Sequence, residues 1–462
     1  MDSKRQSEIS FSEALKFWFK LGFISFGGPA GQIAIMHKEL VEEKRWISEK
    51  RFLHALNFCI VLPGPEAQQL AIYIGWLMHR TWGGIVAGVL FVLPSLFILI
   101  ALSYVYVVFG NVPWVLGLLY GIKSAVAAVV VQAVHRIGSK TLKTPTTAPL
   151  LWMIAILSFL ALYLLHVPFP AIIICAALIG AFGGKYLPDQ FSAAAKHATS
   201  AHSESSKTTA VIDDNTPTPS HALFKKSRLA AVVLVGAVLW LVPMAVLMMS
   251  QGWNGALTQM AWFFTKAALL TFGGAYAVLP YVYQGAVEQF SWLSGSQMID
   301  GLALGETTPG PLIMVVAFVA FVGGWTMQVL GPESLFLGAA LAATIVTWFT
   351  FLPSFLFILA GGPLVETTHN NLKFTAPLTA ITAAVVGVIA SLALFFIAHI
   401  AIKTSATPSL GANATDSILS HVDLFAIALA ASAAVALIRY KIGVAPVLIA
   451  CAVAGLARQM LT

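Results

Sequence analysis

Two Pro-Gly-Pro triplets lie inside long apolar stretches of the chain, at 63–65 and 309–311. Each proline removes a backbone donor and clashes with the preceding helical turn. Freed backbone groups persist in hydrocarbon only where protein buries them or a water-filled cavity reaches them. We therefore expect each triplet to break its helix at a protein-lined site, where the half-helix that follows presents free amides and a positive dipole end to an anion. A simple kink is the alternative, because Pro and Gly are frequent in transmembrane helices.

Two Phe-Gly-Gly triplets, at 26–28 and 272–274, precede the Pro-Gly-Pro triplets. Glycine permits positive φ and close backbone approach, so these triplets could line the same site. Close packing of neighbouring helices is the other interpretation. Three nearby polar side chains could donate hydrogen bonds to oxygen atoms of a ligand: Gln32, Gln68 and Thr308.

Four ionisable residues fall inside the apolar stretches close to these motifs. Lys20 and Lys266 lie at equal distances before the two Gly-Gly pairs and could supply positive charge. The alternative is that both lysines extend to the membrane surface, as lysines near helix ends do. Glu66 and Glu306 flank the two Pro-Gly-Pro triplets and are candidates for proton coupling, with a structural hydrogen bond as the alternative.

The composition excludes a water-soluble globule. Of the 462 residues, 58% are apolar and only 10% are charged, against about 25% charged in ordinary soluble domains. The net charge of +7 comes from short loops and tails rather than from one folded basic face, so nucleic acid is not indicated. We expect no metal site, no cofactor and no enzymatic activity, and the absence of a phosphate-gripping loop argues against ATP-driven transport.

Membrane-spanning segments of about 20 residues are the natural unit of such a chain. Thirteen are predicted, as six, one and six, and a polar stretch follows the first six. The expected crossings are 11–36, 53–78, 84–109, 112–134, 149–166, 168–187, 228–250, 258–284, 298–324, 333–360, 374–400, 422–439 and 443–461. The expected domains are an N-terminal membrane repeat (1–187), a polar disordered linker (188–227), a connecting transmembrane helix (228–250) and a C-terminal membrane repeat (251–462).

The two sets of six segments are copies of each other. At an offset of 246 residues, Phe-Gly-Gly, Trp46 and Pro-Gly-Pro of the first half match Phe-Gly-Gly, Trp292 and Pro-Gly-Pro of the second half. Leu-Pro-Ser at 93–95 matches the same triplet at 352–354 at an offset of 259. Six crossings followed by one more place the second copy in the opposite orientation. The fold class is thus an all-α integral membrane protein with two inverted-topology repeats, an architecture common among secondary transporters.

The distribution of basic residues favours a cytoplasmic N-terminus. The loop from His37 to Arg51 is an exception, because it would be external and yet carries five basic residues. A re-entrant hairpin formed by the first segment is one explanation.

Taken together, the motifs resemble the chromate ion transporter family in its long two-domain form. The residues that carry the resemblance are Phe-Gly-Gly-Pro at 26–29 with Gln32, Leu-Pro-Gly-Pro at 62–65, Phe-Gly-Gly-Ala-Tyr at 272–276 and Pro-Gly-Pro-Leu at 309–312. The resemblance spans both halves but not the linker.

The resemblance implies an inner-membrane, multi-pass protein that exports chromate and confers resistance, with sulfate as the isosteric anion. An anion channel and a sulfate uptake transporter are the alternatives. The expected partners are the anion and the lipid bilayer, and a homodimer is one option for the assembly. The candidate substrate-binding residues are Lys20, Gly27, Gly28, Gln32, Pro63, Gly64, Pro65, Gln68, Lys266, Gly273, Gly274, Thr308, Pro309, Gly310 and Pro311, with Glu66 and Glu306 as proton-coupling candidates.

Overall fold

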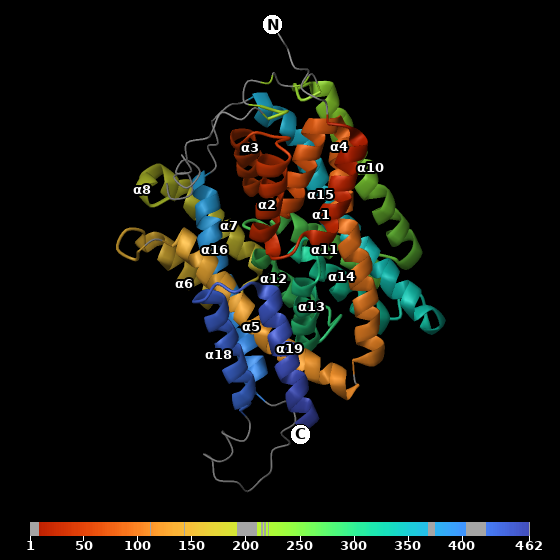
Figure 1. The fold of residues 1–462 in the computed structure, drawn as a ribbon, viewed down its shortest axis with the longest axis vertical. Coiled ribbons are helices and arrows are strands. Elements are labelled where there is room, and N and C mark those ends of the chain that lie inside the picture. Colours follow the sequence, from red (N-terminus) through yellow and green to blue (C-terminus); the bar gives the residue numbers. More distant parts are fainter. Residues whose placement is uncertain are drawn as a thin grey trace.

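The chain folds as an all-α membrane protein (Figure 1). The computed structural model describes residues 9–110, 112–142, 144–191, 210–213, 216, 219, 221–367, 375–402 and 422–461. The helices of the first half are α1 (Phe11–Ile24), α2 (Gly28–His37), α3 (Glu49–Val61), α4 (Glu66–Phe109), α5 (Pro113–Thr141), α6 (Pro149–Tyr163), α7 (Phe169–Tyr186) and the short α8 (Pro188–Phe191). Those of the second half are α10 (Lys226–Gln251), α11 (Ala256–Leu270), α12 (Ala275–Tyr283), α13 (Gly295–Thr307), α14 (Val315–Thr326), α15 (Leu335–Thr367), α16 (Thr375–Ala401), α18 (Leu424–Ile438) and α19 (Val444–Leu461).

Seven helices in the described part of the chain are long and apolar enough to cross a membrane. A helix satisfies all its backbone groups internally, which is what the hydrocarbon requires. The seven are α4, α5, α7, α10, α15, α16 and α19, and three shorter apolar helices accompany them. Among the seven, α5 and α16 are the most deeply buried and pack against each other near the centre of the bundle.

The structure splits four of the thirteen predicted crossings into pairs of shorter helices. The break between α1 and α2 falls at Gly27, and that between α11 and α12 falls at Gly273 and Gly274, all with positive φ. The breaks between α3 and α4 and between α13 and α14 fall at the Pro-Gly-Pro triplets, as predicted. Segments 11–36, 53–78, 258–284 and 298–324 are therefore not single continuous helices, which agrees with the predicted breaks at the Gly-Gly and Pro-Gly-Pro motifs. The number of membrane crossings stays a prediction.

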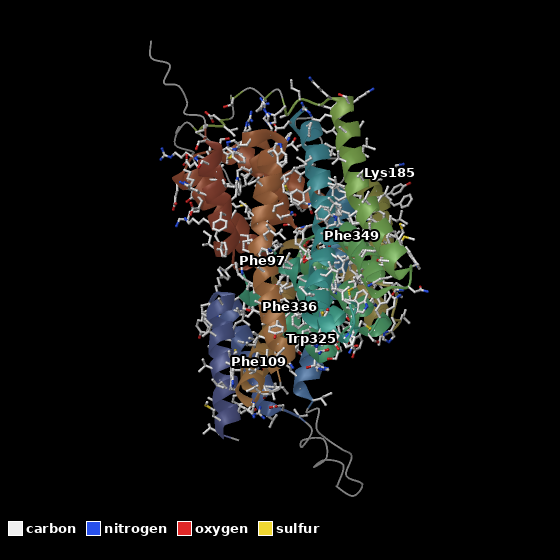
Figure 2. All side chains as sticks on the ribbon, turned by 90° about the vertical axis from the view of Figure 1, so that its right-hand side faces the viewer. Phe97, Phe109, Lys185, Trp325, Phe336 and Phe349 are labelled. Atoms are coloured by element: carbon white, nitrogen blue, oxygen red, sulfur yellow. The ribbon has the colours of Figure 1, made fainter. Side chains whose placement is uncertain are left out.

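α4 breaks at His79 and Arg80, and the part after this break packs beside α15 and runs in the opposite direction. In Figure 2 the chain descends from Phe97 to Phe109 in α4, whereas it rises from Phe336 to Phe349 in α15. Pro94 of α4 and Pro353 of α15 are the matched prolines of the two halves. Matched helices of opposite direction are what an inverted repeat requires.

Part of the predicted linker is docked on the N-terminal half. The backbone of Val211 and Ile212 donates to the carbonyls of Arg45 and Trp46, each at 3.0 Å, and Ser48 donates to the Ile212 carbonyl. The side chain of His221 contacts the Trp76 carbonyl at 3.0 Å. Residues 192–209, 214, 215, 217, 218 and 220, which together form more than half of the predicted linker, lie outside the described part of the chain.

Candidate functional site

The two Pro-Gly-Pro breaks are joined to the two Gly-Gly breaks by a reciprocal pair of hydrogen bonds. The amide of Gly64 donates to the carbonyl oxygen of Thr271, and the amide of Gly310 donates to that of Ser25, both at 2.8 Å. Each bond joins one half of the chain to the other. Because the donors and the acceptors are matched residues of the two repeats, this contact has the pattern that a two-fold relationship produces.

Each Pro-Gly-Pro glycine also lies against the serine of the other half's Leu-Pro-Ser triplet. A Cβ atom on Gly64 would lie 2.6 Å from Ser354 Oγ, and one on Gly310 would lie 2.7 Å from Ser95 Cβ. Both glycines have positive φ, at 127° and 104°. No other residue type satisfies both the backbone conformation and the close approach of the neighbouring helix.

Two glutamines satisfy carbonyl groups that the breaks leave without helical partners. The amide nitrogen of Gln32 donates to the Gly310 carbonyl at 2.5 Å and to the Ser25 carbonyl at 3.3 Å. That of Gln69 donates to the Pro63 carbonyl at 2.7 Å. The structure thus places Gln32 at the predicted site, with its donor engaged by backbone rather than free.

Polar atoms without partners remain at the same place. Gln68 is fully buried, and neither its oxygen nor its nitrogen has a hydrogen-bond partner in the described part of the chain. The hydroxyl of Ser95, beside Gly310, is also buried and unpartnered. Buried polar groups are nearly always paired with protein, water or a ligand. These side chains are consequently available to bind a polar ligand at the junction of the two halves.

The two carboxyl groups predicted for proton coupling lie near one arginine. An oxygen of Glu66 lies 3.9 Å from the point where a Cβ on Gly274 would stand, at the start of α12. Tyr276, also on α12, donates its hydroxyl hydrogen to Glu306. The guanidinium of Arg136 lies 5.9 Å from the centre of the Tyr276 ring and within electrostatic reach of both carboxyl groups. The carboxylate of Glu66 thus occupies the N-terminal end of a half-helix, where an anion is favoured.

Arg136 was not among the predicted site residues. It stands just after an apolar stretch, near Lys140 and Lys143, where a charge usually belongs to a loop. The structure extends α5 to Thr141, so that Arg136 lies on the helix and is half-buried. A helical continuation of the apolar stretch beyond 134 was the signal that could have revealed it.

The structure does not bring Lys20 and Lys266 into this arrangement. The Lys20 side chain is 58% exposed and pairs with Glu39 at 2.7 Å. Lys266 is half-buried and lies 5.7 Å from the ring centre of Trp262.

The remaining predicted residues surround the breaks themselves. Thr308 is buried and donates to the Gly305 carbonyl at 3.1 Å, which caps the end of α13. Gly27 is exposed, and a Cβ on Gly28 would meet open space. Gly273, by contrast, faces Thr382 of α16. Pro65, Pro309 and Pro311 are buried and Pro63 is half-buried.

Comparison with known proteins assigns this chain to a family. The family model described as chromate transporter matches residues 12–181 and 258–456, which are the two halves without the linker. The chain belongs to the chromate transporter family. No solved structure matches this member of the family.

Curated relatives agree with the family assignment. The chromate transport protein of Pseudomonas aeruginosa is 34% identical over 385 residues, covering 82% of this chain and 80% of the relative. That of Cupriavidus metallidurans is 29% identical, with 82% and 80% covered. An uncharacterized transporter of Bacillus subtilis, YwrA, is 27% identical over 177 residues, which are 94% of its own length and 37% of this chain. A protein much shorter than this transporter thus matches part of it over nearly its whole length.

Proposed function

We propose that this transporter exports chromate across the inner membrane and confers chromate resistance, with sulfate as a second substrate of the same shape. The observation that carries the proposal is the reciprocal junction of the Pro-Gly-Pro and Gly-Gly breaks, which gathers interrupted helix ends and unpartnered polar side chains in one place. Discontinuous helices whose N-termini face an anionic group are a recurring form of secondary-transporter site. Membership in the chromate transporter family supports the choice of oxyanion.

The proposed site is built from both repeats. Gln68 and Ser95 supply donors to the oxyanion, and the half-helix beginning at Glu66 supplies free amides. The carboxylate of Glu66 lies at the start of α12, so an anion that approaches this helix end competes with it. Protonation of Glu66 or Glu306 would remove that competing charge and would couple proton movement to transport.

Export follows from the charge of the substrate. Moving one elementary charge through 100 mV is worth about 2.3 kcal/mol, so an inside-negative potential favours the outward movement of a dianion by about twice that amount. Export therefore needs no coupling ion, whereas uptake of sulfate would need protons or cations to accompany the anion.

The proposed topology places residues 1–187 and 251–462 as inverted repeats with a cytoplasmic N-terminus. The opposite directions of α15 and of the part of α4 after its break, together with the existence of a much shorter relative that matches part of this chain, support this arrangement. Labelling of single cysteines from either side of the membrane tests the topology.

A homodimer is the proposed assembly. The molecular mass of the purified protein in detergent, corrected for bound detergent, tests it.

Replacement of Pro63, Gly64 and Pro65 by alanine tests the proposed site in cells. We expect this variant to insert into the membrane at the normal level and to lose chromate resistance. Replacement of the exposed threonines 144, 146 and 147 by alanine is the matched control and should retain resistance. Normal resistance in the Pro-Gly-Pro variant would remove this motif from the mechanism.

A further inference from the structure

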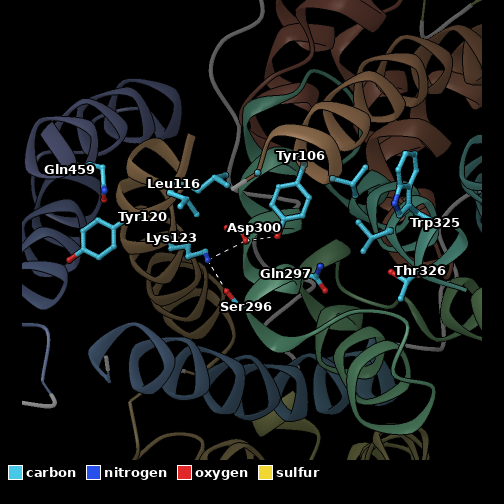
Figure 3. A pocket seen from close by; sticks show the side chains of 14 residues that line it. Tyr106, Leu116, Tyr120, Lys123, Ser296, Gln297, Asp300, Trp325, Thr326 and Gln459 are labelled. Carbon is cyan, nitrogen blue, oxygen red and sulfur yellow. Dashed lines mark hydrogen bonds and ion pairs between the residues drawn. The ribbon is translucent and has the colours of Figure 1, made fainter. Parts of the chain in front are cut away.

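A pocket of about 680 Å³ lies away from the breaks, at the outer ends of the half-helices α13 and α14 (Figure 3). These two half-helices converge on the Pro-Gly-Pro triplet at 309–311. The end of α4, the first half of α5 and the end of α19 complete its wall. The pocket therefore lies at the end of this half-helix pair that is opposite to its Pro-Gly-Pro break.

Lys123 of α5 is the basic residue that lines this pocket. Its ammonium group lies 2.7 Å from Ser296 Oγ and 3.2 Å from Asp300 Oδ2. An ammonium group has three donors. Two of them are engaged in the described part of the chain, and the third is available to a ligand in the pocket.

The ion pair presents its positive end to the pocket. Both residues line the pocket, but the side chain of Lys123 is 24% exposed, whereas that of Asp300 is only 3% exposed. Tyr106 donates to the same carboxylate oxygen of Asp300 at 2.9 Å. An ion that enters the pocket consequently meets the ammonium group before it meets the carboxylate.

The rest of the lining combines apolar side chains with neutral polar ones and adds no further charged residue. Tyr120 donates its hydroxyl to Asp423 at 2.8 Å, and Asp423 forms an ion pair with Arg458 at 2.8 Å. Gln297, Thr326 and Gln459 add neutral side chains that donate hydrogen bonds. Hydrogen-bond donors around one partly exposed cation suit an oxyanion.

We propose that this pocket is an anion-binding vestibule, in which Lys123 holds a tetrahedral oxyanion on its way to or from the junction of the repeats. The inference extends the proposed transport function by giving the substrate a second binding place near the membrane surface. Asp300 keeps Lys123 in position and limits the strength of binding, because a permeating ion must also leave.

Thiol labelling in detergent tests the vestibule without any transport assay. Leu116 lines the pocket, is 46% exposed and lies seven residues before Lys123 on α5. Leu116→Cys is made in a Cys175→Ser background, since Cys59 and Cys451 are buried. The reaction rate is measured with an anionic and a cationic thiosulfonate reagent of similar size, with and without sodium sulfate. Leu165→Cys, exposed and outside the pocket lining, is the matched reference thiol.

We expect the ratio of anionic to cationic labelling at Leu116→Cys to fall by about threefold to fivefold in Lys123→Gln, because one nearby unit charge is removed. Asp300→Asn keeps the lysine and removes its counter-charge, so the ratio should rise. Sulfate should slow labelling at Leu116→Cys but not at Leu165→Cys. The same labelling rates measured in sodium chloride of equal ionic strength correct for the screening of charges by salt.

Equal ratios in the parent and in both charge variants, or no protection by sulfate beyond that of chloride, would overturn the vestibule. That result would leave chromate export untouched, because export is measured by flux. Conversely, the parent protein could fail to export chromate while sulfate still slows labelling at Leu116→Cys. That result would contradict the proposed function and would keep the pocket as an anion site. Lys123→Gln leaves the buried Asp300 without its cation, which can prevent folding. The Asp300→Asn variant then decides the test alone, because its ratio of anionic to cationic labelling should rise.

Discussion

The amide of Gly64 donates a hydrogen bond to the carbonyl of Thr271, 207 residues further along the chain. Its counterpart, from Gly310 to Ser25, has the same length of 2.8 Å. Hydrocarbon offers no water to the backbone groups at a helix break, so each break needs a protein partner. Each half of the chain supplies that partner to the other. The two halves are therefore mutually dependent at the place where their helices are interrupted.

Substitution of a Pro-Gly-Pro glycine should damage this junction. In Gly310→Ala we expect a loss of about 1–3 kcal/mol for the strained backbone alone, and a further loss from the contact with Ser95. Gly138→Ala, in which the new Cβ would meet its nearest neighbour at 3.4 Å, is the control and should be neutral. Thermal unfolding of the purified proteins measures both.

Removal of the opposing side chain provides a second check on the same contact. Ser95→Gly takes away the atom that lies 2.7 Å from a Cβ on Gly310. We expect the double variant Gly310→Ala with Ser95→Gly to be more stable than Gly310→Ala alone, although the strain at positive φ remains. Equal melting temperatures for the single and double variants would show that this contact does not limit the site.

Tyr276→Phe should lower both stability and chromate flux. The change removes a buried hydrogen bond to the carboxyl group of Glu306, which is worth about 1.5–3 kcal/mol when the acceptor is charged. Tyr281 lies on the same helix and stacks its ring on Phe263 at 4.6 Å. Tyr281→Phe is the matched control, and flux that is equally reduced in both variants would mean that the Glu306 contact has no special role.

Arg136→Gln should reduce chromate flux, and the reduction should be larger than the loss of stability of the variant can account for. This arginine is the cation that acts on both Glu66 and Glu306, so its loss leaves Glu306 without a compensating charge and leaves Glu66 with Lys140 alone. Lys185→Gln, an exposed cation on α7, is the control of equal charge change. Flux assays in proteoliposomes with equal protein content compare the two. Full flux in Arg136→Gln would exclude a role for this charge in the transport step.

The sequence was informative where local chemistry decides the structure. Two prolines around a glycine interrupt a helix more strongly than the single prolines Pro94 and Pro353, which stay inside α4 and α15, so the break after Val61 was predictable. The position of Arg136 was not, because it depends on how far α5 continues and on which helices pack beside it. The pairing of Lys20 with Glu39 likewise depends on the return of the chain after α2, which no spacing rule reveals. The docking of Ile212 on Trp46 joins segments with no shared pattern.

The docked part of the linker should loosen as the pH falls. Burial, assisted by the nearby charges of Arg80 and Arg228, lowers the pKa of His221 below its ordinary value of 6.5, although its contact with the Trp76 carbonyl opposes this effect. The docked state thus favours the neutral imidazole, and the undocked state binds more protons. Docking is strongest above pH 6.5 and weakens as the pH falls below that value.

Thiol accessibility at a buried linker residue measures this dependence. Ala222 is fully buried, so Ala222→Cys in the Cys175→Ser background should react slowly while the linker is docked. Its maleimide rate, divided by that of Leu165→Cys at the same pH, should rise between about pH 7.5 and about pH 5.5. His221→Gln should remove the rise. A flat profile in the parent protein would show that His221 does not control the docking.

Uptake of labelled chromate into everted membrane vesicles, with and without an imposed potential, tests the central claim most directly. In everted vesicles the cytoplasmic face is outside, so export appears as uptake. We predict saturable uptake that an interior-positive potential increases, that unlabelled sulfate inhibits, and that Gly64→Ala or Gly310→Ala abolishes at equal protein levels. Uptake that is indifferent to the potential and unchanged in both glycine variants would contradict the account.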